Sequence, residues 1–298
     1  MHKIHFGSSA DTPPHALTTA PEAVAKLIEK AIAATMTPEI ARSAVEGHAE
    51  SLASLGRTIA VQEGHLLEAV IIALASTHPS RVTLTDLRLP VLPAAVEVIK
   101  RNRRKLYEGI SFEAHSNPSA GTYHPDLVVV DATGRCAVII DVKRSLSGYL
   151  GGSKLLELQQ RMTASGLVLP DVLWRDHQRL AVETVGTAIV DGSKTSTDVS
   201  DGVWPLSRLD DLLQIEGASR LAIESMEAFR CGLRQQWQAA IAAAAAKDQR
   251  TAAASIAAAE AELSKSQTRE IAPRRRGRPP KARPSIQVGV LGPGLRPH

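Results

Sequence analysis

Two short apolar runs, LVVV at 127–130 and AVII at 137–140, constrain this chain more than any other feature. Both follow a region of helical periodicity and are uninterrupted by polar residues. Asp131 and Gly134 lie between them and fit a tight turn, so the two runs predict a β-hairpin. Continuous apolar strands are buried on both faces, which places this hairpin in the middle of a sheet covered by helices.

The segments on either side of the hairpin predict the helices that cover the sheet. Thr37 followed by Pro38 is the capping residue and first-turn proline of a helix start. The order of the segments predicts an α/β fold with a mixed central sheet flanked by helices. Helices are expected at roughly 21–35, 38–55, 61–76, 94–109 and 151–165, a short strand at 111–115, and one or two strands within 179–192.

Beyond Trp204 the sequence is helical again. Phe229, Leu233, Trp237 and Ile241 recur every four residues and form a packing stripe, which fades into an alanine-rich stretch. Alanine favours helix but buries little apolar surface, so a long helix or spacer is expected. A homodimer could form through this helix. The expected organisation is a disordered segment 1–20, helices at 21–58, a core at 59–203, a helical extension at 204–268 and a disordered tail at 269–298.

The net charge of +4 is unevenly distributed. Residues 269–298 hold eight Lys/Arg and one Glu, a charge of +7, whereas the rest holds 27 Lys/Arg and 30 Asp/Glu, a charge of −3. A basic tail on a mildly acidic body is typical of a protein that binds a polyanion. Two distant cysteines, no apolar signal-peptide core and no apolar run long enough for a bilayer favour a cytoplasmic protein without a membrane segment.

Both predicted strands carry an aspartate at the end far from the turn. Alternate side chains on a strand share a face, so Asp141 and Lys143 point the same way. Counting outward from the turn places Asp126 beside them. Two adjacent carboxylates repel unless a cation lies between them, and oxygen ligands of this kind suit Mg²⁺ or Mn²⁺. Such a metal activates water and polarises phosphate, and a lysine beside it can stabilise the transition state.

Here the chain resembles a known family. Pro125-Asp126 followed by Asp141-Val142-Lys143, with a hairpin between, resembles the PD-(D/E)xK motif of the restriction-endonuclease-like nucleases. The resemblance covers roughly residues 60–192 and implies an αβββαβ core. It further implies Asp126, Asp141 and Lys143 as catalytic residues, with the backbone carbonyl of Val142 among the metal ligands.

The family usually adds a glutamate from the first core helix, and this chain offers two. Glu68, four residues after Gly64, matches the family spacing and is the first choice as a catalytic and metal-binding residue. Glu63 is the alternative, because its helical phase places it on the core side. The same resemblance makes Gln159 or Gln160 a candidate on the helix that follows Lys143.

The tail contains the sequence RRRGRPPKAR, which resembles an AT-hook. Its glycine lets the backbone lie deep in a narrow groove, and the flanking arginines extend along the groove floor. The A·T minor groove is narrow and strongly negative, whereas the guanine amine obstructs the same path in G·C pairs. The expected DNA-binding residues are Arg274, Arg275, Arg276, Gly277, Arg278, Pro279, Lys281 and Arg283.

Two independent features therefore point to DNA. The first expectation is a divalent-metal-dependent DNA nuclease anchored on A/T-rich DNA by its tail. The second is a non-catalytic nucleoid or regulatory DNA-binding protein with the same fold. The third is a nuclease subunit that acts only within a larger DNA-processing complex.

Overall fold

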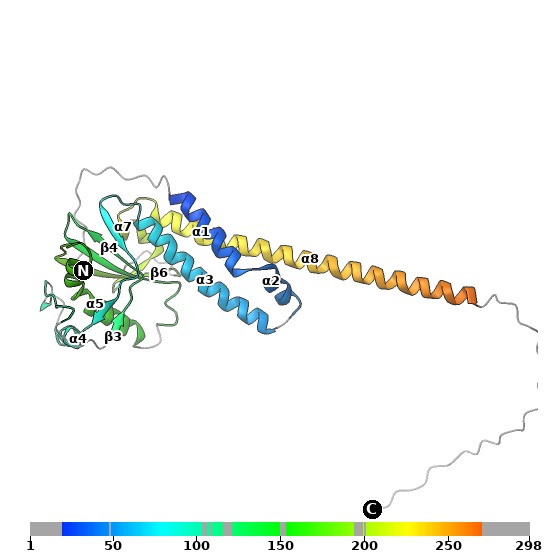
Figure 1. The fold of residues 1–298 in the computed structure, drawn as a ribbon, viewed down its shortest axis with the longest axis horizontal. Helices are drawn as coiled ribbons and strands as arrows, with labels where there is room; N and C mark the ends of the chain where they lie inside the picture. Colours follow the sequence, from blue (N-terminus) through cyan, green and yellow to red (C-terminus); the bar gives the residue numbers. More distant parts are fainter. Residues whose placement is uncertain are drawn as a thin grey trace, which may run out of the picture. The chain divides into compact units, whose positions relative to one another are not determined.

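The structure, a computed structural model, describes residues 20–47, 49–102, 106–107, 109–115, 121–149, 153–193, 199 and 201–269. It is an α/β fold in which helices precede, interrupt and follow one main sheet (Figure 1). The elements are α1 (Ala20–Thr35), α2 (Pro38–Val45), α3 (Ala49–Ala75), β1 (Arg81–Leu84), β2 (Leu89–Val91), α4 (Pro93–Arg101), β3 (Gly121–Tyr123), β4 (Leu127–Asp131), β5 (Cys136–Lys143), α5 (Lys154–Gly166), α6 (Leu169–Asp176), β6 (Thr184–Asp191), β7 (Val203–Pro205), η2 (Leu206–Arg208), α7 (Leu209–Leu213) and α8 (Ala218–Arg269).

The main sheet is mixed, as the sequence predicts. Its five strands lie in the order β1-β4-β5-β6-β7. The pairs β1–β4 and β4–β5 are antiparallel, whereas β5–β6 and β6–β7 are parallel. Strands β2 and β3 pair separately as a two-stranded antiparallel ribbon. The predicted hairpin is therefore β4–β5, at the point where the sheet changes from antiparallel to parallel.

Each face of the sheet carries its own apolar core. Alternate residues of β5, such as Val138 and Ile140, pack with α1, α3, α7 and α8 on one face. Their neighbours Ala137 and Ile139 pack with β2, β3, α4, α5 and α6 on the other. Every residue of β4 is buried, and so is every residue of β5 except Lys143. Burial on both faces explains why the two runs are apolar throughout.

Helix α3 is the central helix of the first core and lies beside α1 (Figure 1). Its residues Leu67, Val70, Ile71 and Leu74 are almost completely buried. By length and composition alone the segment Glu50–Ala75 is also apolar enough to cross a membrane. Part of the segment, 39% of an 18-residue window, is buried inside the fold, and the buried side chains belong to the first core.

The predicted boundary between the second and third helices is wrong. The break lies at Gly47, which has a φ of +86° after the end of α2, and α3 then runs unbroken from Ala49 through Gly56. Only glycine adopts positive φ without strain, so Gly47 can end a helix, whereas Gly56 keeps ordinary helical geometry. The predicted cap is present, because the Thr37 side chain accepts a hydrogen bond from the Ile40 backbone.

The first strand of the antiparallel meander is also not where the sequence placed it. The structure has no strand at 111–115, and the strand that pairs with β4 is β1. Strand β1 has only four residues and none of them is fully buried. Such a short, half-exposed edge strand gives almost no periodic signal, which is why the pattern missed it.

The chain divides into two compact units, one ending at Ala245 and one beginning at Ala246. The expected boundary at 58–59 falls inside α3, and the core and its flanking helices share the first unit. In α8, Phe229 and Leu233 are buried in that unit and Trp237 packs against its core, while Ile241 is exposed. The second unit contains the C-terminal part of α8. The expected disordered segments, apart from Ala20 at the start of α1 and Arg269 at the end of α8, lie outside the described ranges, as does every AT-hook residue.

Candidate active site at the open end of the hairpin

The hairpin register brings the two aspartates together. Leu127 is paired with Ile140, so one step outward from the turn places Asp126 beside Asp141. Asp141 and Lys143 are on the same face of β5, because they alternate with the core residue Val142. The three side chains therefore meet at the end of the hairpin opposite its turn.

Hydrogen bonds fix the position of both carboxylates. The backbone N–H of Val142 donates to Asp126 Oδ2 at 2.5 Å. The Tyr123 hydroxyl donates to Asp141 Oδ2 at 2.8 Å. The side chain of Asp141 is only 4% exposed, so its charge is held in a largely desolvated place. Burying a carboxylate in this way is costly unless a cation or donors compensate it.

Three oxygen atoms surround the Lys143 ammonium. Its Nζ forms an ion pair with Asp141 Oδ1 and lies 3.9 Å from Asp126 Oδ2 and 3.5 Å from the carbonyl oxygen of Val142. Asp141 Oδ1 is buried and accepts no well-aligned hydrogen bond, so this ion pair is what compensates its charge. The open end of the hairpin therefore favours a positively charged group.

The electrostatics of the cluster follow from burial and from the crowding of like charges. Burial, with the neighbouring Asp141 charge, raises the pKa of Asp126 to about 6. Burial would lower the pKa of Lys143, but Asp141 and Asp126 outweigh it and the pKa of the amine is raised. Burial and Asp141 likewise raise the pKa of the Tyr123 hydroxyl, which keeps it a proton donor. Several perturbed pKa values within one cluster are common at functional sites.

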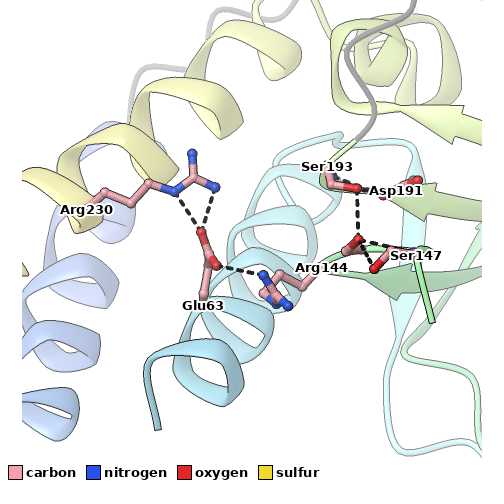
Figure 2. Close-up of polar contacts among 7 residues, drawn as sticks. Glu63, Arg144, Ser147, Asp191, Ser193 and Arg230 are labelled. Atoms are coloured by element: carbon pink, nitrogen blue, oxygen red, sulfur yellow. Dashed lines mark hydrogen bonds and ion pairs between the residues drawn. The ribbon is translucent and has the colours of Figure 1, made fainter. Parts of the chain in front are cut away.

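The two candidate glutamates of α3 have different surroundings. Burial raises the pKa of Glu68, and the charges of His65, Lys143 and Asp141 act on its carboxylate. Glu63 instead forms ion pairs with Arg230 and Arg144 (Figure 2). Glu63 is thus already paired with two arginines, whereas Glu68 interacts electrostatically with Lys143 and Asp141, which favours Glu68 as the helix carboxylate of this site.

Two features of the site escaped sequence reasoning. Tyr123 reaches Asp141 from β3, with Arg161 of α5 lying over its ring at 5.9 Å from the centroid. A three-residue strand paired with another three-residue strand carries no usable periodicity.

The candidate Gln159 of α5 donates to the backbone carbonyl of Asp201 at 2.6 Å, a structural contact.

The donor set has the chemistry that a hard divalent cation requires. Carboxylate and carbonyl oxygens from Asp126, Asp141 and Val142 converge on one position, and Mg²⁺ and Mn²⁺ prefer oxygen ligands. Within the part of the chain that the structure describes, no group of three His, Cys, Asp or Glu side chains is arranged to hold a metal. A metal here would therefore need solvent or substrate oxygens to complete its coordination beside the two aspartates.

No family model matches the chain, and searches of curated proteins and of solved structures find no match either. What the protein does is therefore inferred from its own geometry.

Proposed function

We propose that this protein is a divalent-metal-dependent DNA nuclease that hydrolyses phosphodiester bonds at the open end of the β4–β5 hairpin. One observation carries the proposal: Asp126, Asp141 and Lys143 meet there, with the Lys143 ammonium among oxygens that would suit a metal ion. A buried carboxylate crowded by a second, half-buried one and an amine is expensive to fold, and a catalytic use explains why it is present.

The order of the elements supports the same proposal. Helix α3, the antiparallel strands β1, β4 and β5, helix α5 and the parallel strand β6 occur in this order along the chain, with β2, α4, β3 and α6 between them. This order is compatible with the αβββαβ core that the resemblance to restriction-endonuclease-like nucleases implies. Asp126 immediately precedes β4, Asp141 and Lys143 lie on β5, and Glu68 lies on α3.

The chain's own residues have separate tasks in this proposal. Asp126, Asp141, the Val142 carbonyl and Glu68 would hold Mg²⁺ or Mn²⁺, which when bound supplies Lewis-acid activation of water and phosphate. Lys143 moves its charge from Asp141 toward the phosphate oxygens, where negative charge grows in the transition state. Tyr123 keeps Asp141 oriented so that Oδ1 faces the reacting position.

A cleavage assay with controlled metal tests the proposal. Wild type should cut at least one of duplex, single-stranded or branched DNA in Mg²⁺ or Mn²⁺ and none in EDTA. Asp141→Asn keeps the size of the side chain but removes its charge, so it should abolish cleavage while leaving DNA binding largely intact. Cleavage that persists in Asp141→Asn would contradict this site.

One observation favours a second candidate, a non-catalytic DNA-binding protein on the same fold. The Lys143–Asp141 ion pair already compensates the buried charge without any metal. In that case wild type would bind DNA but cut none of its forms in either metal. The same assay therefore separates the two candidates.

We further propose that the tail anchors the protein on DNA, in keeping with a nucleoid-associated location. The acidic remainder of the chain has a charge of −3, whereas residues 269–298 carry +7. Substituting Arg276 and Arg278 together by Ala should reduce the preference for A/T-rich over G/C-rich duplex in a competition assay at fixed salt. Equal wild-type affinity for both duplexes would reduce the tail to a nonspecific basic arm.

A further inference from the structure

Glu63 is a buried carboxylate shared by two arginines from distant parts of the chain. Its side chain is 9% exposed. Arg230 of α8 donates to Oε1 through Nε at 2.8 Å and through Nη2 at 2.6 Å. Arg144, the residue after β5, approaches Oε2 through Nη1 at 3.5 Å. Figure 2 shows the two guanidinium groups on either side of this single carboxylate.

The two arginines are held unequally. Arg230 makes two short contacts that compensate the Glu63 charge, whereas the Arg144 contact is long and single. One carboxylate cannot neutralise two guanidinium groups, so the cluster retains a net positive charge. The Arg144 side chain is 46% exposed, which leaves it accessible to a ligand. Arg144 is therefore tethered at one nitrogen and available at its others, a geometry that suits a second anionic partner.

Arg144 lies immediately beyond Lys143 in the chain. Consecutive Cα atoms are about 3.8 Å apart, and successive side chains of an extended segment point to opposite faces, so Arg144 would reach a different phosphate of the backbone from the one at Lys143. Strands β5 and β6 are parallel, and the carboxyl ends of parallel strands are where ligands bind in open α/β sheets.

The hydroxyls of Ser145, Ser147 and Ser193 lie just beyond the carboxyl ends of β5 and β6, and Figure 2 labels Ser147 and Ser193. Ser145 Oγ is 3.1 Å from the hydroxyls of Ser147 and of Ser193, and Ser193 also donates to Asp191. Serine hydroxyls and arginines are frequent donors to DNA phosphates. The surroundings of Arg144 thus offer neutral donors and one partly available cation, with the carboxylates of Glu63 and Asp191 already hydrogen-bonded.

We propose that Arg144 binds a DNA backbone phosphate next to the one at Lys143, and that Glu63, itself fixed by Arg230, positions the Arg144 guanidinium for this contact. The inference rests on the proposed function for its substrate, DNA, but concerns binding and not cleavage. Arginine suits this task because its planar fork matches two phosphate oxygens.

The test measures DNA binding in EDTA, where cleavage does not interfere. Arg144→Gln in the full-length protein should weaken duplex binding about tenfold and reduce the slope of log affinity against log salt by about one. Arg144→Lys should keep the salt slope and lose part of the affinity. Duplexes with a single neutral methylphosphonate locate the contact: one position should weaken wild type and have no additional effect on Arg144→Gln.

Arg135→Gln is the matched control, because Arg135 immediately precedes β5 at the other end of the same strand and also pairs with a glutamate. It should bind like wild type. If every methylphosphonate weakens wild type and Arg144→Gln by the same factor, or if wild type binds no DNA, the proposal is overturned. If wild type binds and the predicted position is found but nothing is cut, the phosphate contact stands and the nuclease proposal fails.

Discussion

The two ends of the β4–β5 hairpin carry similar side chains in opposite circumstances. At the turn, Asp131 Oδ1 accepts a 2.7 Å hydrogen bond from the Gly134 backbone, and Arg135 pairs with Glu183 on the surface. Each charge there has a local partner, and the acid serves to fix the turn. Aspartate in such a turn needs no explanation beyond structure.

At the open end the same residue types are crowded together, with Asp141 buried and Asp126 and Lys143 half-buried. Asp126 and Asp141 lie side by side, and the Lys143 ammonium is shared between them. The pKa of Asp126 rises to about 6 because burial and the second carboxylate oppose its ionisation. The comparison shows that residue type alone does not distinguish a candidate site. What distinguishes this one is that like charges are held close together and partly desolvated by the fold.

The largest expected difference between the two ends is in catalysis. Lys143→Gln should slow metal-dependent DNA cleavage about 100-fold or more, because a cation facing the developing negative charge is lost. Arg135→Gln should leave the rate unchanged, since its exposed ion pair contributes little. Single-turnover rates at saturating enzyme measure both. Equal rates for the two variants would remove the functional distinction between the ends.

A smaller difference is expected in stability and its pH dependence. The folded pKa of Asp126, about 6, exceeds its ordinary value of 3.8, so the folded state holds the proton over that interval. The free energy of unfolding should therefore fall as pH rises from about 4 to 6. Asp126→Asn removes this effect and should stabilise the metal-free protein at pH 7.5 by about 1 to 3 kcal/mol.

Asp131→Asn is the control for that measurement, because an amide oxygen can still accept the Gly134 hydrogen bond. Asp131→Asn should not raise the free energy of unfolding at pH 7.5 by a comparable amount. Urea unfolding in EDTA at pH 4.5, 6 and 7.5 provides the values. A stability of Asp126→Asn equal to wild type at pH 7.5 would mean that the open end is not in electrostatic conflict.

The smallest effect is expected for the hydroxyl that orients Asp141. Tyr123→Phe keeps the ring beneath Arg161 but removes the donor to Asp141 Oδ2. We expect cleavage to slow about tenfold with KM unchanged, because orientation of a catalytic group affects the chemical step and not substrate binding. A raised KM with the same kcat would instead place Tyr123 in substrate binding.

Much of the site was predictable because its geometry is local. One hairpin carries Asp126, Asp141 and Lys143. Its register follows from the turn, and the face on which each side chain lies follows from the two-residue periodicity of a strand. The choice between Glu63 and Glu68 was not predictable in this way. Helical phase placed Glu63 toward the core, which is correct since it is buried, yet its partners there are Arg144 and Arg230.

The sequence by itself determined the α/β class, the buried hairpin, the long C-terminal helix and the meeting of two carboxylates with a lysine. These depend on periodicity, turn chemistry and helix propensity, which act between near neighbours in the chain. Only the tertiary structure decided that Tyr123 reaches Asp141, that β1 completes the meander and that Arg230 reaches Glu63 across 167 positions. Such contacts depend on how whole elements pack around two cores. A local sequence pattern does not specify which side chain from a distant part of the chain contacts a buried carboxylate.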